Sequence, residues 1–351
     1  MTCLEEEIML KLKSLVLVAV LFVAAGAMAS NFRVADQVYV PIAGHAAGSS
    51  GTFISDVFIS NVTADTVSVS VILSVGANGA QQNFPNVITL APNERQEILD
   101  IFPTKLGLPS GLGQLIFNGC KQGGNCDVNT CPNGTSTGEC PDFRNISVES
   151  RIYQIAPGAN QATAPTTGQL FAGIPWYNFV SSDSSGVGLD KVFITGLRNT
   201  SAYRGNVGLV NASQFSTTTL VVKLFDGKTN TQIGSNFQQT LGPLGQVQPS
   251  LGSMFSGFTG VTATNAFVTV EQTNTQPTSD AVAAGCPNGC PAFFAYASVL
   301  DNQSGDATTL EPQYFRSLWD LGANHGAVNC IYSAVCKTGL PATIHRAVKH
   351  Q

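Results

Sequence analysis

The chain after residue 30 is built from short runs in which hydrophobic and polar positions alternate. A period of two residues is that of a β-strand with one buried face. The runs recur about every ten residues and are separated by Gly, Asn and Pro, which is typical of antiparallel β-sandwiches. No amphipathic helix is predicted in this part of the chain. The clearest run places Val67, Val69, Val71, Leu73 and Val75 on one face, and a second places Leu220, Val222 and Leu224 there before an Asp226-Gly227 hairpin turn.

The order of these segments occurs twice, with an offset of about 150 residues, which is too long a period for a solenoid. Each copy is long enough to bury its own core. We therefore predict an all-β chain of two tandem antiparallel, immunoglobulin-like β-sandwich domains related by an internal repeat. They cover residues 30–180 and 189–316, with a Ser/Gly-rich linker at 181–188. The segments that carry the repeat are DQVYV (36–40) and DKVFI (190–194), FISDVFISN (53–61) and YRGNVGLVN (203–211), LAPNERQEILDIF (90–102) and LGPLGQVQPSLGSMF (241–255), and QLIF (114–117) and FVTV (267–270).

Residues 1–29 have the pattern of a secretion signal. Basic residues precede an apolar run at 15–25, and a small-residue cleavage pattern follows at 27–29. Three glutamates stand before the basic residues, so Met9 is an alternative to Met1 as the start of the signal. The apolar run is short for a membrane span, which needs about 20 residues, and no later stretch approaches that length. We expect a mature protein exported by a Sec-type route to the cell surface or extracellular space, with the periplasm as the alternative.

The cysteines predict disulfides. The sequence holds nine, and Cys3 lies in the expected signal, which leaves an even number in an exported chain. Cys-Pro-Asn-Gly occurs at 131–134 and again at 286–289, in both copies within the loop before the same predicted strand. In the first copy this Cys-rich loop covers 118–141, and a further pair lies in the C-terminal tail at 317–351. Equivalent bonds in equivalent loops predict the pairs Cys120–Cys126, Cys131–Cys140, Cys286–Cys290 and Cys330–Cys336.

The amino-acid composition limits the classes of molecule that the protein is expected to bind. Charged residues make up 11% of the chain, against about 25% in an ordinary soluble domain. Hydrophobic content is 43%, so uncharged polar residues and glycine take the place of the missing charge. The net charge is −5 and the basic residues are scattered, which excludes a nucleic-acid partner, because that binding needs clustered Lys and Arg.

Residues that bind metals are sparse. Structural zinc sites favour Cys-x2-Cys pairs, which the sequence lacks. The segment DNQSGD (301–306) has acidic ends but not the alternating ligands of a calcium loop, and it predicts a hairpin turn. We therefore expect no metal and no cofactor.

One histidine, His45, lies inside an expected domain. A Ser-His-Asp set can be written around it, with Asp56 as the acid and a serine at position 49 or 50 as the nucleophile. The Gly-x-Ser-x-Gly motif is absent, and an ordinary loop histidine is the interpretation that we favour. No catalytic residue is assigned.

Aromatic side chains are the remaining candidates for ligand binding. Trp176 and Tyr177 stand near the end of the first expected domain, and Trp319 has a similar place after the second. An exposed ring with a polar tip suits a carbohydrate ligand. Packing against the ends of the sandwiches is the alternative, and we favour it.

Two segments, GLRNTSAYRGNVGLVN (196–211) and AYASVLDNQSGDATT (295–309), resemble those of a group of exported bacterial proteins built from paired β-sandwich modules. The resemblance covers residues 32–312 and leaves out the tail. It implies the fold and the export, and it supplies no catalytic residues.

Export, low charge and tandem sandwiches together favour a non-enzymatic structural or adhesive protein. Exposed sheet edges are expected to join subunits by strand addition, as in extracellular filaments. The expected partners are further copies of the chain, or an extracellular glycan or protein. Two alternatives remain open, a carbohydrate-binding protein that uses the aromatic residues and a secreted hydrolase centred on His45.

Overall fold

The computed structural model describes residues 34–48, 51–126, 142–156, 158–161, 166–181, 191–255, 263–282, 289–314 and 317. All of them belong to one unit, which begins at Arg33. The expected signal at 1–29 lies outside the described residues, as do most of the linker and the tail. None of the helices described is long and apolar enough to cross a membrane.

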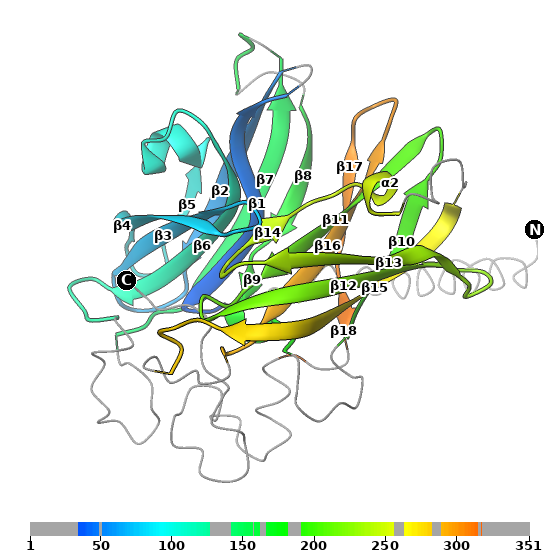
Figure 1. The fold of residues 1–351 in the computed structure, drawn as a ribbon. Coiled ribbons are helices and arrows are strands. Elements are labelled where there is room, and N and C mark those ends of the chain that lie inside the picture. The colour runs from blue at the N-terminus through cyan, green and yellow to red at the C-terminus, as the bar shows by residue number, and fades with distance from the viewer. Residues whose placement is uncertain are drawn as a thin grey trace, which may run out of the picture. The chain divides into compact units, whose positions relative to one another are not determined.

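The described residues up to 181, here called the first half, form two antiparallel sheets (Figure 1). Their elements are β1 (Gln37–Ala47), β2 (Thr52–Asn61), β3 (Val67–Val75), β4 (Ala80–Leu90), β5 (Arg95–Ile98), the π-helical turn η1 (Phe102–Leu106), β6 (Gly111–Lys121), β7 (Ile146–Ile155), β8 (Thr167–Ala172), β9 (Ile174–Pro175) and the 3-10 turn η2 (Trp176–Asn178). Sheet A has the order β5-β2-β7-β8, and sheet B has the order β4-β3-β6-β1-β9. The last two residues of β1 also pair with β2, which joins the sheets at one corner.

The described residues from 191 onward, the second half, form two further antiparallel sheets. Their elements are β10 (Lys191–Asn199), β11 (Tyr203–Asn211), β12 (Ser216–Asp226), β13 (Gln232–Leu241), β14 (Gln246–Val247), α2 (Leu251–Met254), β15 (Ala263–Pro277), β16 (Phe293–Asp301), β17 (Ala307–Leu310) and β18 (Gln313–Tyr314). Sheet C has the order β14-β11-β16-β17, and sheet D has the order β13-β12-β15-β10-β18. Adding nine to each strand number of sheets A and B therefore gives the pairing order of sheets C and D.

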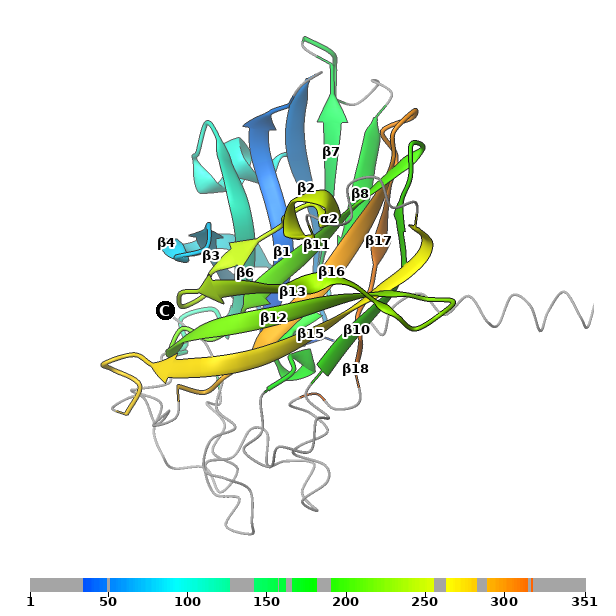
Figure 2. The same ribbon diagram turned by 45° about the vertical axis from the view of Figure 1, so that its right-hand side comes forward.

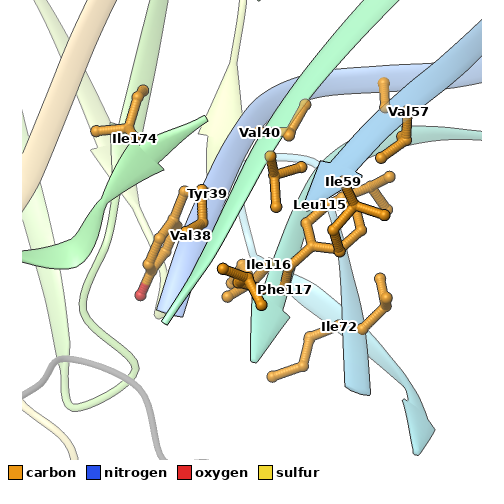
Figure 3. Packing of buried hydrophobic residues seen from close by; sticks show 14 of the residues in the cluster. Val38, Tyr39, Val40, Val57, Ile59, Ile72, Leu115, Ile116, Phe117 and Ile174 are labelled. Atoms are coloured by element: carbon orange, nitrogen blue, oxygen red, sulfur yellow. The ribbon is translucent and has the colours of Figure 1, made fainter. Parts of the chain in front are cut away.

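Each pair of sheets encloses a hydrophobic core. In the first half, Val57 and Ile59 of β2 lie beside Leu115 and Phe117 of β6, as Figure 3 shows. In the second half, residues of β11 pack with residues of β12 and β15, among them Val207, Leu209, Val222 and Val268. Burying one such side chain contributes about 1.5–3 kcal/mol, so this packing stabilises each pair of sheets.

A third buried layer joins the two halves, between the outer faces of sheets B and C. Tyr39 of β1 donates a hydrogen bond from its hydroxyl to the Ala212 carbonyl, at 3.3 Å. Its ring meets Phe179 edge-on at 4.5 Å, and Phe179 in turn meets Phe294 of β16 at 6.2 Å. The core cluster of the first half therefore continues into residues of β11 and β16, whose strands come forward in Figure 2.

Turns on the two sides of this layer interlock through their backbones. Gly242 N donates to Ala77 O at 2.8 Å, and Gln246 N donates to Gly76 O at 3.0 Å. These bonds connect the β3–β4 turn with the turn between β13 and β14. The four sheets thus follow the packing order A, B, C, D, with buried contacts between each sheet and the next.

Burial of β3 differs from the expectation of one exposed face. The strand has the predicted bounds, but its serines are buried as well as Val67, Val69 and Val71, and Val75, predicted on the buried face, is 41% exposed at the strand end. Ser74 is fully buried and donates its hydroxyl to Leu244 O of the second half, at 2.7 Å. At Ser74 the covering surface comes from the second half, and Ser68 and Ser70 bond to Asn86 of β4, so the alternation within the strand does not reveal this burial. In β12, by contrast, buried and partly exposed positions alternate as predicted.

Candidate functional site

His45 lies near the end of β1, and its partner differs from the one expected. Its Nδ1 is 2.7 Å from Oδ2 of Asp100, not from Asp56. Asp100 follows β5 with a left-handed φ of 45°, a conformation that Asp tolerates better than most residues. Asp56 Oδ1 accepts the backbone N–H of Asp100 at 2.9 Å, so Asp56 holds the turn that presents Asp100 to the histidine.

The network extends from Asp56 to β7. The Tyr153 hydroxyl donates to Asp56 Oδ2 at 2.7 Å, and Gln161 donates its amide to both groups, at 3.0 Å and 2.8 Å. Burial, together with the hydrogen bond to Asp56, raises the pKa of Tyr153 to about 12. The Arg151 guanidinium lies 4.6 Å above the tyrosine ring. These contacts tie β1, β2, β7 and the turn after β5 to one another.

Burial sets the electrostatics of Asp100. It raises the pKa of the carboxyl, and the nearby Asp56 acts in the same direction, while the hydrogen bond from His45 opposes both. Oδ1 of Asp100 is buried and has no hydrogen-bond partner among the described residues. The carboxylate is therefore held in a position where its charge is poorly solvated.

A histidine with an aspartate on Nδ1 supplies two members of a hydrolase triad. The third member would be a hydroxyl or thiol near Nε2. Within the described ranges no such group is hydrogen-bonded to His45, and the serines at 49 and 50, named as nucleophile candidates, lie outside those ranges. The described contacts of His45 are therefore those of a residue that fixes the junction of sheets A and B.

Two of the predicted aromatic ligands are buried, which contradicts their use as a sugar platform. Trp176 is 0% exposed and Tyr177 is 4% exposed. The indole N–H donates to Asp36 Oδ1 at 3.2 Å, and the Tyr177 hydroxyl donates to Val34 O at 2.8 Å. Both rings pack beneath β1 at the end of the first sandwich, as the favoured alternative stated. Trp319 lies outside the described residues.

A hollow of about 480 Å³ lies on the second half, and sequence reasoning missed it. Its lining includes Arg198 of β10 and Tyr203 of β11, with the guanidinium 5.2 Å from the ring centroid. It also includes Asp301 and Asp306, at the two ends of the β16–β17 turn. Aromatic, cationic and acidic groups thus converge on one open surface, where they are able to hydrogen-bond a polar ligand.

The hairpin that borders this hollow is the turn predicted from DNQSGD. Asp301 Oδ1 accepts the backbone N–H groups of Gln303 and Ser304, at 2.7 Å and 3.1 Å. The aspartate therefore caps its own turn, and the hairpin prediction is confirmed. Among the described residues there is no group of three or more His, Cys, Asp or Glu side chains placed to hold a metal ion.

The structure contains one disulfide with both members described, Cys120–Cys126, at the end of β6. It is one of the four predicted pairs. Cys290 is also disulfide-bonded, and its predicted partner Cys286 lies outside the described residues. The predicted pairs Cys131–Cys140 and Cys330–Cys336 lie outside them as well.

No family model matches the chain, and no curated protein sequence matches it. Among solved structures it is similar to Bacteroides uniformis beta-glucuronidase 2 covalently bound to cyclophellitol-6-carboxylate aziridine, at 10% identity and a TM-score of 0.14. That likeness covers 81% of this chain and 26% of the glucuronidase, so the chain spans about a quarter of that protein. It is also similar to a lectin from Pleurotus ostreatus in complex with GalNAc, at 11% identity and a TM-score of 0.14, over 80% of this chain and 77% of the lectin. Likeness at this level carries no argument about function.

Proposed function

We infer that the two halves are tandem immunoglobulin-like sandwiches that arose by an internal repeat. The shared pairing order of their strands supports this origin. So does the register, because Val38 pairs with Phe117 as Val192 pairs with Val270, and these are positions that the sequence repeat aligns. Two unrelated sandwiches would have no reason to agree in both respects.

We propose that the protein is a non-enzymatic, exported structural or adhesive element of the cell surface or extracellular space. The observation that carries this proposal is the buried layer between sheets B and C. A mobile linker would let two binding modules turn independently, whereas here the core is continuous and the turns are bonded backbone to backbone. A force applied to one half therefore passes to the other through packed side chains.

Most of the edge strands disfavour strand addition, the expected means of assembly, and β8, the six-residue edge of sheet A, is the exception. β4 contains Pro85 and a left-handed Asn86, and its pairing with β3 shifts register beside them. β13 likewise shifts register against β12 and has Gly234 at a φ of 70°. β5, β14, β17, β9 and β18 are four residues or shorter. Bulged, proline-containing and short edges are the features that prevent edge-to-edge pairing.

Cell fractionation tests the proposed role. Antibody against the purified protein is used to follow it through the cytosol, periplasm, surface, filament and medium fractions of cells that produce it. We expect it in the surface, filament or medium fraction, with a cytosolic enzyme as the marker of leakage. A protein confined to the cytosol would overturn the proposal.

The hollow beside Arg198 favours a second candidate function, carbohydrate binding. Sugar hydroxyls are recognised by charged and amide groups around an aromatic face, and Arg198, Tyr203 and Asp306 supply such groups. A glycan array with the wild type and with Arg198→Ala tests it. Arg204→Ala is the matched control, because Arg204 lies in β11 next to Tyr203 but bonds to Asn302 instead of lining the hollow. Binding that both variants retain would place the sugar elsewhere, and an empty array would remove the candidate.

A further inference from the structure

The contact between the two halves joins two sheet faces that are not equivalent. The same kind of contact can therefore form a second time, between two chains. The outer face of sheet B, with Tyr39 and Ser74, is covered by the outer face of sheet C and the segments beside it, with Tyr296, Ala212 and Leu244. Sheet D stands where sheet B stands in the shared pairing order, and sheet A stands where sheet C does. The outer faces of sheets D and A therefore correspond to the two sides of this contact, and among the described residues neither face packs on another sheet. One end of the outer face of sheet A is covered by Gln161, which bonds to Asp56 and Tyr153.

The outer face of sheet D carries aromatic side chains at the matching positions. Phe193 pairs with Thr269 as Tyr39 pairs with Ile116, so Phe193 occupies the place of the tyrosine. Phe225 and Phe267 lie stacked on the same face, with ring centroids 5.0 Å apart and planes 12° apart. All three phenylalanines are partly exposed. Phe225 and Phe267 thus leave part of their stacked rings at the surface of this sheet face.

The outer face of sheet A carries exposed hydrophobic side chains at its matching positions. Phe58 is 36% exposed and pairs with Glu149, as Gly208 pairs with Tyr296 in sheet C. Val62, just after β2, is 46% exposed and corresponds to Ala212 after β11. Leu170 of β8 is 49% exposed on the same face. These are three of the nine large hydrophobic side chains that are exposed among the described residues.

The charges of the two faces are complementary. On sheet D, Lys191 and Lys223 lie 2.9 Å and 3.3 Å from a single carboxylate, Glu271, so one positive charge is left over. On sheet A, Phe58 is flanked by two carboxylates, Glu97 on β5 and Glu149 on β7. Two basic residues lie on the same face, each two positions along its strand from one of these carboxylates. Arg151 of β7 stacks on the ring of Tyr153, and Arg95 of β5 pairs with Ser60 of β2. The centre of sheet A is thus acidic where the centre of sheet D is basic.

We propose that chains associate head to tail, with the outer face of sheet D of one copy packed on the outer face of sheet A of the next. The packing order then continues as A, B, C, D, A, B, C, D, and each new contact repeats the one between the halves. A contact between two different faces leaves one of each kind free at the ends, so its repetition generates an open filament unless the rotation between copies closes a ring. This inference rests on the structural role proposed above, because it names the partner through which that role is exercised.

Charge reversal on the purified mature chain tests the stacking. Sedimentation velocity over a concentration series measures self-association, and electron microscopy shows filaments. Lys223→Glu on sheet D and Glu149→Lys on sheet A are each expected to weaken association about tenfold. The double variant Lys223→Glu/Glu149→Lys is expected to recover it, because every contact in its filament again joins opposite charges. A mixture of the two single variants is expected to recover it for the same reason.

Controls separate the surface from the fold. Lys228→Glu makes the same charge change in the exposed β12–β13 turn, away from both faces, and is expected to associate like the wild type. Val62→Arg, at an exposed position on sheet A, is expected to weaken association without loss of thermal stability. Filaments that persist in Lys223→Glu and Val62→Arg would overturn this stacking and leave the structural role standing. A wild type that is monomeric at every concentration would overturn the stacking, while fractionation would decide the structural role separately.

Discussion

Asn61 and Asn211 make the same set of hydrogen bonds at the ends of β2 and β11. The Asn61 side-chain amide donates to three backbone carbonyls and its oxygen accepts one backbone N–H, and Asn211 does the same 150 positions later. The partners of Asn61 are Asp65 O (2.7 Å), Leu90 O (3.4 Å), Ala91 O (2.8 Å) and Thr63 N (2.9 Å), and those of Asn211 are Ser216 O (2.8 Å), Leu241 O (3.3 Å), Gly242 O (2.8 Å) and Ser213 N (3.1 Å). In each half one amide thus fastens the chain as it crosses from one sheet to the other.

Replacing either asparagine by alanine is expected to lower the free energy of unfolding by about 2–4 kcal/mol, because several buried carbonyls lose their donor at once. Both side chains are at most 2% exposed, so water does not replace the lost bonds. Denaturant unfolding of Asn61→Ala and Asn211→Ala measures the effect. Asn236→Ala, on the exposed face of β13, is the control and is expected to change stability by less than about 0.5 kcal/mol. Equal losses at all three positions would show that the hydrogen bonds do not matter.

The interlocked turns between the halves predict a difference between two glycines of one turn. Gly76 and Gly79 both have left-handed φ values, of 68° and 64°. A Cβ atom at Gly79 would lie 1.9 Å from Pro243 O of the second half, whereas a Cβ at Gly76 would meet nothing within 4 Å. Both alanine variants carry the backbone strain, but only Gly79→Ala also pushes the halves apart. We expect Gly79→Ala to be less stable than Gly76→Ala by about 2 kcal/mol in thermal or denaturant unfolding. Equal stabilities would mean that the contact between the turns contributes little.

Strand positions were predictable from the sequence because they depend on local alternation. The alternating runs predicted at Val67–Val75 and at Leu220–Leu224 are observed as β3 (Val67–Val75) and within β12 (Ser216–Asp226). The burial of both faces of β3 is not predictable from its own alternation, because the partner of Ser74 is Leu244, 170 positions away, and the partner of Ser68 and Ser70 is Asn86 in a bulge of β4. A prediction made one strand at a time treats the outer face as solvent-exposed.

The environment of His45 was missed for a related reason. Closeness in sequence favours Asp56 as its partner, yet a turn after β5 brings Asp100 to the imidazole instead. That turn depends on a left-handed backbone at Asp100 and on its N–H bond to Asp56, neither of which has a sequence motif. The hollow at Arg198 is also not predictable from the sequence, because the residues that line it come from four strands, β10, β11, β16 and β17.

We expect the disulfide Cys120–Cys126 to make a moderate contribution to the free energy of unfolding. It closes a loop of six residues, for which chain-entropy arguments give about 2 kcal/mol. The double variant Cys120→Ser/Cys126→Ser is expected to unfold at lower denaturant concentration by that amount, with the same slope. A loss of the whole transition would show instead that the first half folds only when the bond is present.

The raised pKa of Asp100 predicts how stability changes with pH. Burial favours the protonated form in the folded state, so the pKa of the folded protein lies above that of the unfolded chain. The contribution of this group to stability is therefore fully present below the ordinary aspartate pKa of about 3.9 and is lost as pH rises through the folded-state pKa.

Asp100→Asn keeps the oxygen that faces His45, tolerates the left-handed backbone and does not titrate. We expect the stability of the wild type relative to that of Asp100→Asn to fall as pH is raised from 3 to 7 in denaturant unfolding. Carboxylates with lowered pKa values, such as Glu271 with its two lysines, act in the opposite direction but are common to both proteins, so they cancel in the difference. A difference that is constant with pH would show that the Asp100 carboxyl titrates alike in the folded and unfolded chains.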